Sequence, residues 1–189
     1  MILEKIKNFD WYNEPKNVRF IEEGILVETH PNTDFWQCLD SNFSKDNGHL
    51  FVEECDGDFV VTGKWSCFKI KDSAQCGIMV RFNELNWVKV GLLSSNPYNP
   101  QIGVVVSNNG SCDWSINKID SDKLSIWFKL RRKGRDFIVF YSIDGIVFEQ
   151  IRMIHFAKAS SFAKVGAYAC SPKNESFECV LEELEVDHH

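Results

Sequence analysis

The stretch that decides the fold is residues 76–92, CGIMVRFNELNWVKVGL. Two runs rich in apolar and β-branched residues flank the segment Asn83-Glu84-Leu85, and this pattern predicts a β-hairpin. If the two runs pair with Arg81 opposite Trp87, one face is entirely apolar, with the pairs Cys76–Leu92, Ile78–Val90 and Val80–Val88. The other face is chemically mixed, with the pairs Arg81–Trp87, Met79–Lys89 and Gly77–Gly91. A slip of one residue would place the charges in the core, so this register is strongly specified.

Turn segments rich in Gly, Asn and Asp recur along the rest of the chain. These residue types tolerate the positive φ angles that tight hairpins need. Strands separated by such turns indicate an antiparallel sandwich or barrel. The segments are PNTD at 31–34, DNG at 46–48, DGD at 56–58, NNG at 108–110, KG at 133–134 and DG at 144–145.

Residues 126–154 form the clearest run of consecutive strands. The pattern predicts strands over 126–131, 136–142 and 146–154, because Val, Ile and Phe with regular turn glycines are poor helix material. A short helical turn is expected only within residues 154–164. We expect one all-β domain over residues 1–186. The terminal Val-Asp-His-His resembles the start of a purification tag, so residues 187–189 are expected to be a tag remnant or a disordered tail.

Composition restricts the function classes. The chain has 189 residues, 15 Phe, 6 Trp and a net charge of −6, and this charge argues against a binder of nucleic-acid backbones. The basic run KLRRKGR at 129–135 is interpreted as a solvated strand end and turn, with a nucleic-acid patch as the alternative. No apolar run approaches the roughly 20 residues that cross a membrane. The seven Cys residues are odd in number and form no C-x-x-C pair, so we expect reduced thiols and a cytoplasmic protein.

Several short motifs, taken together and in order, resemble a known family. The motifs are DFWQ at 34–37, DNGH at 46–49, GIMVR at 77–81, WVKVG at 87–91, DWS at 113–115, YSIDG at 141–145 and GAYACSP at 166–172. The chain is similar to the concanavalin A-like domain family of unknown function that includes the fungal regulator-of-enolase proteins. This resemblance implies a two-sheet antiparallel sandwich of the jelly-roll kind with one concave sheet. It implies no established reaction, and it suggests a metabolic enzyme such as enolase as a partner.

The mixed face of the hairpin is the candidate binding surface. Sugars present C–H faces that stack on Trp, and hydroxyls that bind acidic, amide and basic side chains. We therefore expect a non-catalytic domain that binds a saccharide or a related polyol, with an anionic ligand favoured by Arg81 and Lys89. The alternatives are a protein-interaction module that regulates a metabolic enzyme and, third, a carbohydrate-active hydrolase. The candidate ligand-binding residues are Trp36, Gln37, Arg81, Trp87, Lys89, Asp113 and Trp114.

No catalytic, metal or cofactor site is predicted. A glycosidase needs two facing carboxylates, and the acidic clusters fall at expected turns and edges, with only Asp113 placed near the aromatic residues. His30, His49 and His155 have no zinc-ligand spacing, and His49 is expected to form hydrogen bonds within its own turn. Residues 56–58 are interpreted as a charged turn, with a structural Ca²⁺ site as the alternative. No phosphate-binding or dinucleotide motif is present.

Overall fold

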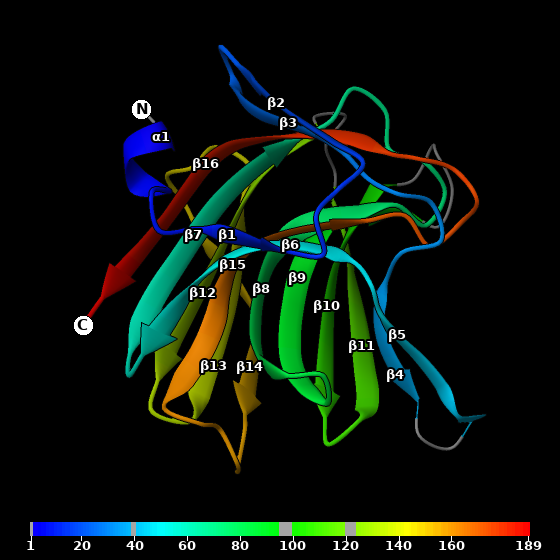
Figure 1. Ribbon diagram of the computed structural model, residues 1–189. Coiled ribbons are helices and arrows are strands. Elements are labelled where there is room, and N and C mark those ends of the chain that lie inside the picture. Colours follow the sequence, from blue (N-terminus) through cyan, green and yellow to red (C-terminus); the bar gives the residue numbers. More distant parts are fainter. Residues whose placement is uncertain (1, 39–40, 95–99, 120–123) are drawn as a thin grey trace.

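The computed structural model describes residues 2–38, 41–94, 100–119 and 124–189, which form two antiparallel sheets packed face to face (Figure 1). The predicted sandwich is thus confirmed. One sheet has nine strands, in the spatial order β1 (Asp10–Tyr12), β6 (His49–Asp56), β15 (Phe162–Cys170), β8 (Gln75–Asn83), β9 (Asn86–Ser94), β10 (Pro100–Asn108), β11 (Ser111–Lys118), β4 (Phe35–Cys38) and β5 (Phe43–Asp46). The other has seven, in the order β14 (Glu149–His155), β13 (Asp136–Ser142), β12 (Ser125–Lys133), β7 (Phe59–Ser66), β16 (Glu178–His188), β3 (Gly24–Glu28) and β2 (Asn17–Ile21).

The hairpin β8–β9 has the register predicted from its sequence. Arg81 lies opposite Trp87, Met79 opposite Lys89 and Gly77 opposite Gly91. The apolar face, with Ile78, Val80, Val88 and Val90 among its residues, lies in the core between the two sheets. Because successive side chains of a strand alternate between faces, this register also fixes which residues point away from that core.

The predicted turns join consecutive strands or follow them directly. Asn32, Asn109 and Gly134 have positive φ angles there, as expected for these residue types. The third strand of the predicted run 126–154 begins later than expected, at Glu149. The reason is that the Asp144 carboxylate accepts hydrogen bonds from the backbone N–H groups that follow it and so extends the turn into residues 146–147.

The helical turn expected within residues 154–164 is absent. β14 continues to His155 and β15 begins at Phe162, and the residues between them form a loop closed by a hydrogen bond from the N–H of Ala159 to the carbonyl of Phe156. Within the described residues the one helix is the short α1 (Ile2–Lys5), which lies against β16. No helix of the described part of the chain is long and apolar enough to cross a membrane.

The basic run at 129–135 follows strand alternation and is only partly solvated. Arg132 is buried and donates hydrogen bonds to the carbonyls of Gly134, Ser160 and Ser161, so it closes a loop rather than facing solvent. Lys133, one residue on, is exposed. The expectation of a solvated strand end is therefore wrong for Arg132.

Residues 187–189 continue the fold. Asp187 and His188 pair with Val60 and Phe59 of β7, and the N–H of His189 donates to the carbonyl of Asp58. The structure thus does not agree with the expectation that a disordered tail begins at residue 187. All seven cysteines are free thiols, and five of them are buried.

The two edge strands of the nine-stranded sheet, β1 and β5, are joined by a side-chain contact. β5 leads directly into β6 through a turn at Asn47 and Gly48, and the Tyr12 hydroxyl of β1 donates to the Asp46 carboxylate of β5 over 2.7 Å. A second, smaller core forms on the outer face of this sheet, the face that points away from the seven-stranded sheet. Its residues are Phe35, Leu50, Val52, Met79, Trp87, Val105, Tyr168 and Cys170.

Candidate functional site

A hollow of about 450 Å³ lies beside this second core, on the outer face of the nine-stranded sheet. We call it the tryptophan hollow. It combines two indole rings with charged, amide and hydroxyl side chains, the composition expected of a small-molecule site. Its lining residues are Asp34, Trp36, Asp72, Ser73, Gln75, Lys89, Leu93, Ser94, Val105, Trp114, Pro172 and Lys173.

The sheet register positions one wall of this hollow. Met79, Lys89, Val105 and Trp114 lie directly opposite one another on four neighbouring strands, β8 to β11. Residues in such a row share a face, so all four side chains point to the outside of the sandwich. Trp36 of β4 meets Trp114 edge to face, with ring centroids 6.2 Å apart. Trp114 is 49% exposed, so its ring is available to a ligand.

Lys89 lies at the base of the hollow and is 1% exposed. Its ammonium group donates to an Asp34 carboxylate oxygen and to the carbonyl oxygen of Phe35, each over 2.9 Å. Burial is the largest single effect and lowers the pKa of Lys89, but the charge and hydrogen bond of Asp34, together with Cys170 and Cys112, raise the pKa above its ordinary value. Lys89 is therefore a positioned, fully paired cation.

Arg81 forms a second, separate ion pair. Its guanidinium contacts the Asp46 carboxylate at 2.6 Å and lies over the Tyr12 ring. Asp46 Oδ1 and Arg81 Nε are buried and have no hydrogen-bond partner among the residues that the structure describes. Arg81 does not line the tryptophan hollow.

Trp87 is completely buried in the second core, and the predicted exposed face is wrong at this residue. Its indole N–H donates to the carbonyl of Glu84, and the Lys89 ammonium lies 5.7 Å from its ring centroid. Phe35 and Trp36 of β4 pack in or against the same core, so part of the cover comes from a segment that follows β3. The hairpin alone contains no signal of this cover.

Asp113 and Gln37 also lie apart from the hollow. Asp113 precedes Trp114 on β11, so alternation directs it to the other face, where it forms an ion pair with Arg152 at 2.8 Å. Gln37 follows Trp36 by one position on β4, so strand alternation likewise directs it to the opposite face, and its side chain is buried. Of the seven predicted residues, the structure thus brings three to the hollow: Trp36, Lys89 and Trp114.

The remaining lining residues were not identified from the sequence. Gln75 and Leu93 form the next pair of the predicted hairpin register, so extending it by one position would have placed both on the mixed face. Asp34 opens the DFWQ motif, and its role depends on a partner 55 positions away. Lys173 follows β15 and is brought near only by the fold.

The sequence predicts that His49 forms hydrogen bonds within its own turn, and this prediction is wrong. His49 instead joins two other segments of the chain. Its Nε2 accepts a hydrogen bond from the His30 N–H over 2.9 Å, and its Nδ1 lies 2.8 Å from the carbonyl of Asn13. Burial lowers the pKa of His49, because the charged ring would lose solvation. Asp58 in the acidic turn accepts a hydrogen bond from the Gly134 N–H over 2.6 Å.

Comparison with protein families gives one match over most of the chain. The model of the family described as "Protein of unknown function (DUF1349)" matches residues 11–189. "Regulation of enolase protein 1" of Saccharomyces cerevisiae is 28% identical over 176 residues, covering 92% of this chain and 86% of the yeast protein.

Solved structures share the sandwich. A protein of unknown function from Saccharomyces cerevisiae superposes with a TM-score of 0.89 at 24% identity, covering 98% of both chains. The GH43 protein BlXynB of Bacillus licheniformis, in its K247S form, gives 0.74 at 12% identity, covering 96% of this chain and 37% of BlXynB. The alginate lyase of Klebsiella pneumoniae gives 0.63 at 8% identity, covering 94% of this chain and 86% of the lyase. At these identities the similarity establishes the fold alone.

Proposed function

The chain belongs to the DUF1349 family, and from this premise we propose that it is a non-catalytic recognition domain that binds a saccharide in the tryptophan hollow. One observation carries the proposal: Trp36 and Trp114 lie edge to face at 6.2 Å beside a hollow that also presents carboxylate, amide and ammonium groups. An exposed indole ring offers a flat apolar surface for the C–H face of a sugar. The polar groups around the indole ring can form hydrogen bonds with the sugar hydroxyls, which the indole face cannot do.

The charges around the hollow favour a neutral sugar over an anionic one. Two carboxylates, Asp34 and Asp72, balance two ammonium groups, Lys89 and Lys173. The Lys89 charge is already matched by Asp34 at 2.9 Å and is not free to attract an anion. The preference for an anionic ligand, which depended on Arg81 and Lys89 facing solvent together, therefore has no support in this geometry.

The shared fold supports the choice of ligand class. Proteins with this sandwich include a xylan β-1,4-xylosidase and an alginate lyase. A fold hosts many functions, so this likeness adds weight only together with the aromatic hollow. A reducing compartment such as the cytoplasm fits seven free thiols.

A second candidate function is regulation of a metabolic enzyme through a protein interface. The name of the yeast relative refers to enolase. A groove of about 440 Å³ between the β2–β3 hairpin and β16 offers a surface for such a partner, and Phe20 at its rim is 62% exposed. Its other lining residues include Glu22, Glu23 and Glu183, so it fits a partner surface with basic and apolar groups.

Two substitutions, measured against two ligands, separate these proposals. We expect Trp114→Ala to weaken saccharide binding about tenfold or more, equivalent to about 1.4 kcal/mol, because it removes the exposed stacking surface. The probes are xylan and alginate oligosaccharides followed by a glycan array, with affinity measured by calorimetry. Phe20→Ser is the matched control, because it removes an exposed aromatic ring on the other sheet. The reverse pattern is expected for enolase, where Phe20→Ser weakens association and Trp114→Ala does not.

Equal saccharide affinity in wild type and Trp114→Ala would overturn the saccharide proposal. Failure of the wild-type chain to bind any sugar on the array would do the same. Circular dichroism checks that both variants remain folded. Since Trp114 is half-exposed, its removal should change the free energy of unfolding by about 1 kcal/mol or less.

A further inference from the structure

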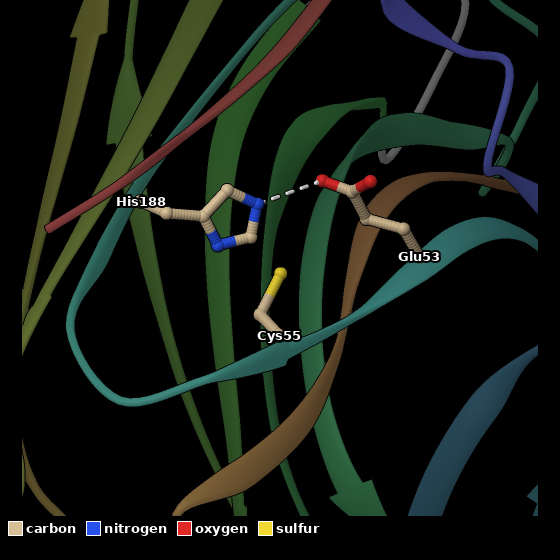
Figure 2. A group of neighbouring side chains, drawn as sticks. All are labelled: Glu53, Cys55 and His188. Atoms are coloured by element: carbon tan, nitrogen blue, oxygen red, sulfur yellow. Dashed lines mark ion pairs between the residues drawn. The ribbon is translucent and has the colours of Figure 1, made fainter.

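Three side chains with metal-binding atoms meet at one end of the sandwich, away from the tryptophan hollow. Glu53 and Cys55 come from β6 of the nine-stranded sheet, and His188 comes from the end of β16 in the other sheet. Figure 2 shows the three side chains pointing toward one another across the gap between these strands. A carboxylate oxygen, the sulfur and an imidazole nitrogen all lie within 4.8 Å of one another.

The strand pattern explains this meeting. Phe51, Glu53 and Cys55 alternate with outward residues and so form the inner row of β6. Phe51 and Cys55 belong to the main core, but Glu53 places a carboxylate in this otherwise apolar row. On β16, Leu184 and Val186 pack in or against the core. The next residue of this inward row is His188, which places an imidazole after the apolar side chains.

The separations suit a tetrahedral metal ion. With bonds of about 2.0–2.3 Å, as zinc forms to nitrogen, oxygen and sulfur, neighbouring ligand atoms lie about 3.3–3.7 Å apart. His188 Nε2 and Glu53 Oε1 are 3.4 Å apart, within this range. The upper limit of 4.8 Å for the group leaves at most a small side-chain rotation to bring the sulfur into position.

Exposure to solvent differs among the three side chains. The side chain of His188 is 53% exposed and that of Glu53 is 15% exposed, whereas Cys55 is buried. An ion can therefore enter past the imidazole and reach the sulfur at the inner end. On binding, the Cys55 thiol would lose its proton to solvent, because the thiolate is the ligand.

The geometry points to a transition-metal site of the zinc type at Glu53, Cys55 and His188, with the fourth position open to water. Thiolate and imidazole donors select zinc and related ions over Ca²⁺ and Mg²⁺, which take oxygen ligands. Because the ligands come from strands of opposite sheets, a bound ion would join the two sheets at this end. Spacing rules do not reveal the site, since His188 follows Cys55 by more than 130 positions and the terminal histidines resemble a purification tag.

Co²⁺ titration of the purified chain, carrying no added histidines, tests the proposal. We expect one Co²⁺ per chain with a near-ultraviolet thiolate-to-cobalt charge-transfer band, and displacement of the Co²⁺ by Zn²⁺. Cys55→Ser should abolish the band, and His188→Gln should weaken affinity about tenfold or more. His189→Gln and Cys38→Ser are the matched controls, because each removes a residue of the same type that lies outside the group.

Three results would overturn the assignment. These are a band that persists in Cys55→Ser, an equal loss in His189→Gln, and no Co²⁺ binding by a folded wild-type chain. If Cys55→Ser fails to fold by circular dichroism, His188→Gln decides the question, because the exposed imidazole is not needed by the core. Glu53→Gln provides a further check, since it keeps the side-chain shape and removes the carboxylate.

Discussion

The positively charged side chain of Lys89 is almost completely buried. The charge is tolerated because its partners, Asp34 and the carbonyl of Phe35, are held at 2.9 Å by a segment that folds over the sheet. From the hairpin sequence, a lysine opposite a methionine indicates a solvent-facing row. The structure shows instead that a residue far along the chain supplies the matching charge. Which face holds Lys89 was therefore predictable, and its burial was not.

Removal of the Lys89 charge should destabilise the fold. Lys89→Met leaves the Asp34 carboxylate without its cation, and loss of one partner of a buried pair costs about 3–5 kcal/mol. The double variant Asp34→Asn/Lys89→Met should cost less than the sum of the two single changes. Urea unfolding of the three variants provides the measurement.

Lys16→Met serves as the control for this prediction. Lys16 pairs with Glu28, but the Lys16 side chain is about half-exposed, and such pairs contribute about 1 kcal/mol or less. A cost for Lys89→Met no greater than that for Lys16→Met would show that the buried pair adds nothing to stability.

At the scale of the element, three glycines lie opposite one another across β8, β9 and β10. They are Gly77, Gly91 and Gly103, and they form one row on the outer face of the sheet. Tyr168 places its hydroxyl group where a Cβ at Gly91 would stand, and Leu93 fills the corresponding space at Gly103. The row thus makes room for bulky neighbours beside the tryptophan hollow. The pairing of Gly77 with Gly91 followed from the register, but the side chains that occupy the space did not.

Alanine substitutions in this row should differ in cost. A Cβ at Gly77 would collide with the carbonyl oxygen of Val90, whereas one at Gly103 would meet the flexible end of the Leu93 side chain. We expect Gly77→Ala to cost about 3 kcal/mol or more, and Gly103→Ala about 1 kcal/mol. Thermal unfolding of both variants tests the order, and equal midpoints would contradict it.

At the scale of the whole molecule, the turns and the hairpin were predictable because they depend on neighbours in sequence. The contact between the two edge strands of the nine-stranded sheet was not, since Tyr12 and Asp46 lie far apart in the sequence. For the same reason the candidate site was predicted only in part. Trp36, Lys89 and Trp114 meet at the hollow, but strand alternation turns Asp113 away from it.

His49 joins three segments, through the His30 N–H and the Asn13 carbonyl, and this should make stability depend on pH. Its folded pKa is lowered from 6.5, so the folded state resists protonation of the ring more than the unfolded state does. The stabilisation is complete above pH 6.5 and is lost as the pH falls from there through the folded pKa. The stability advantage of wild type over His49→Gln should therefore shrink between about pH 7.5 and pH 5.

Urea unfolding at several pH values in this window measures the effect. His155→Gln is the control, because the His155 side chain is 61% exposed. Parallel pH profiles for wild type and His49→Gln would show that burial of His49 has no part in the pH dependence.

The position of β16 has a consequence for how the protein is made. This strand, residues 178–188, is an inner strand of the seven-stranded sheet and lies between β7 and β3 (Figure 1). During synthesis, β3 and β7 leave the ribosome long before the strand that must separate them. Until then both expose unpaired edges, which other chains could join. Folding of this sandwich must therefore wait for the last strand, and the nascent chain depends on fast completion or on chaperones that protect those edges.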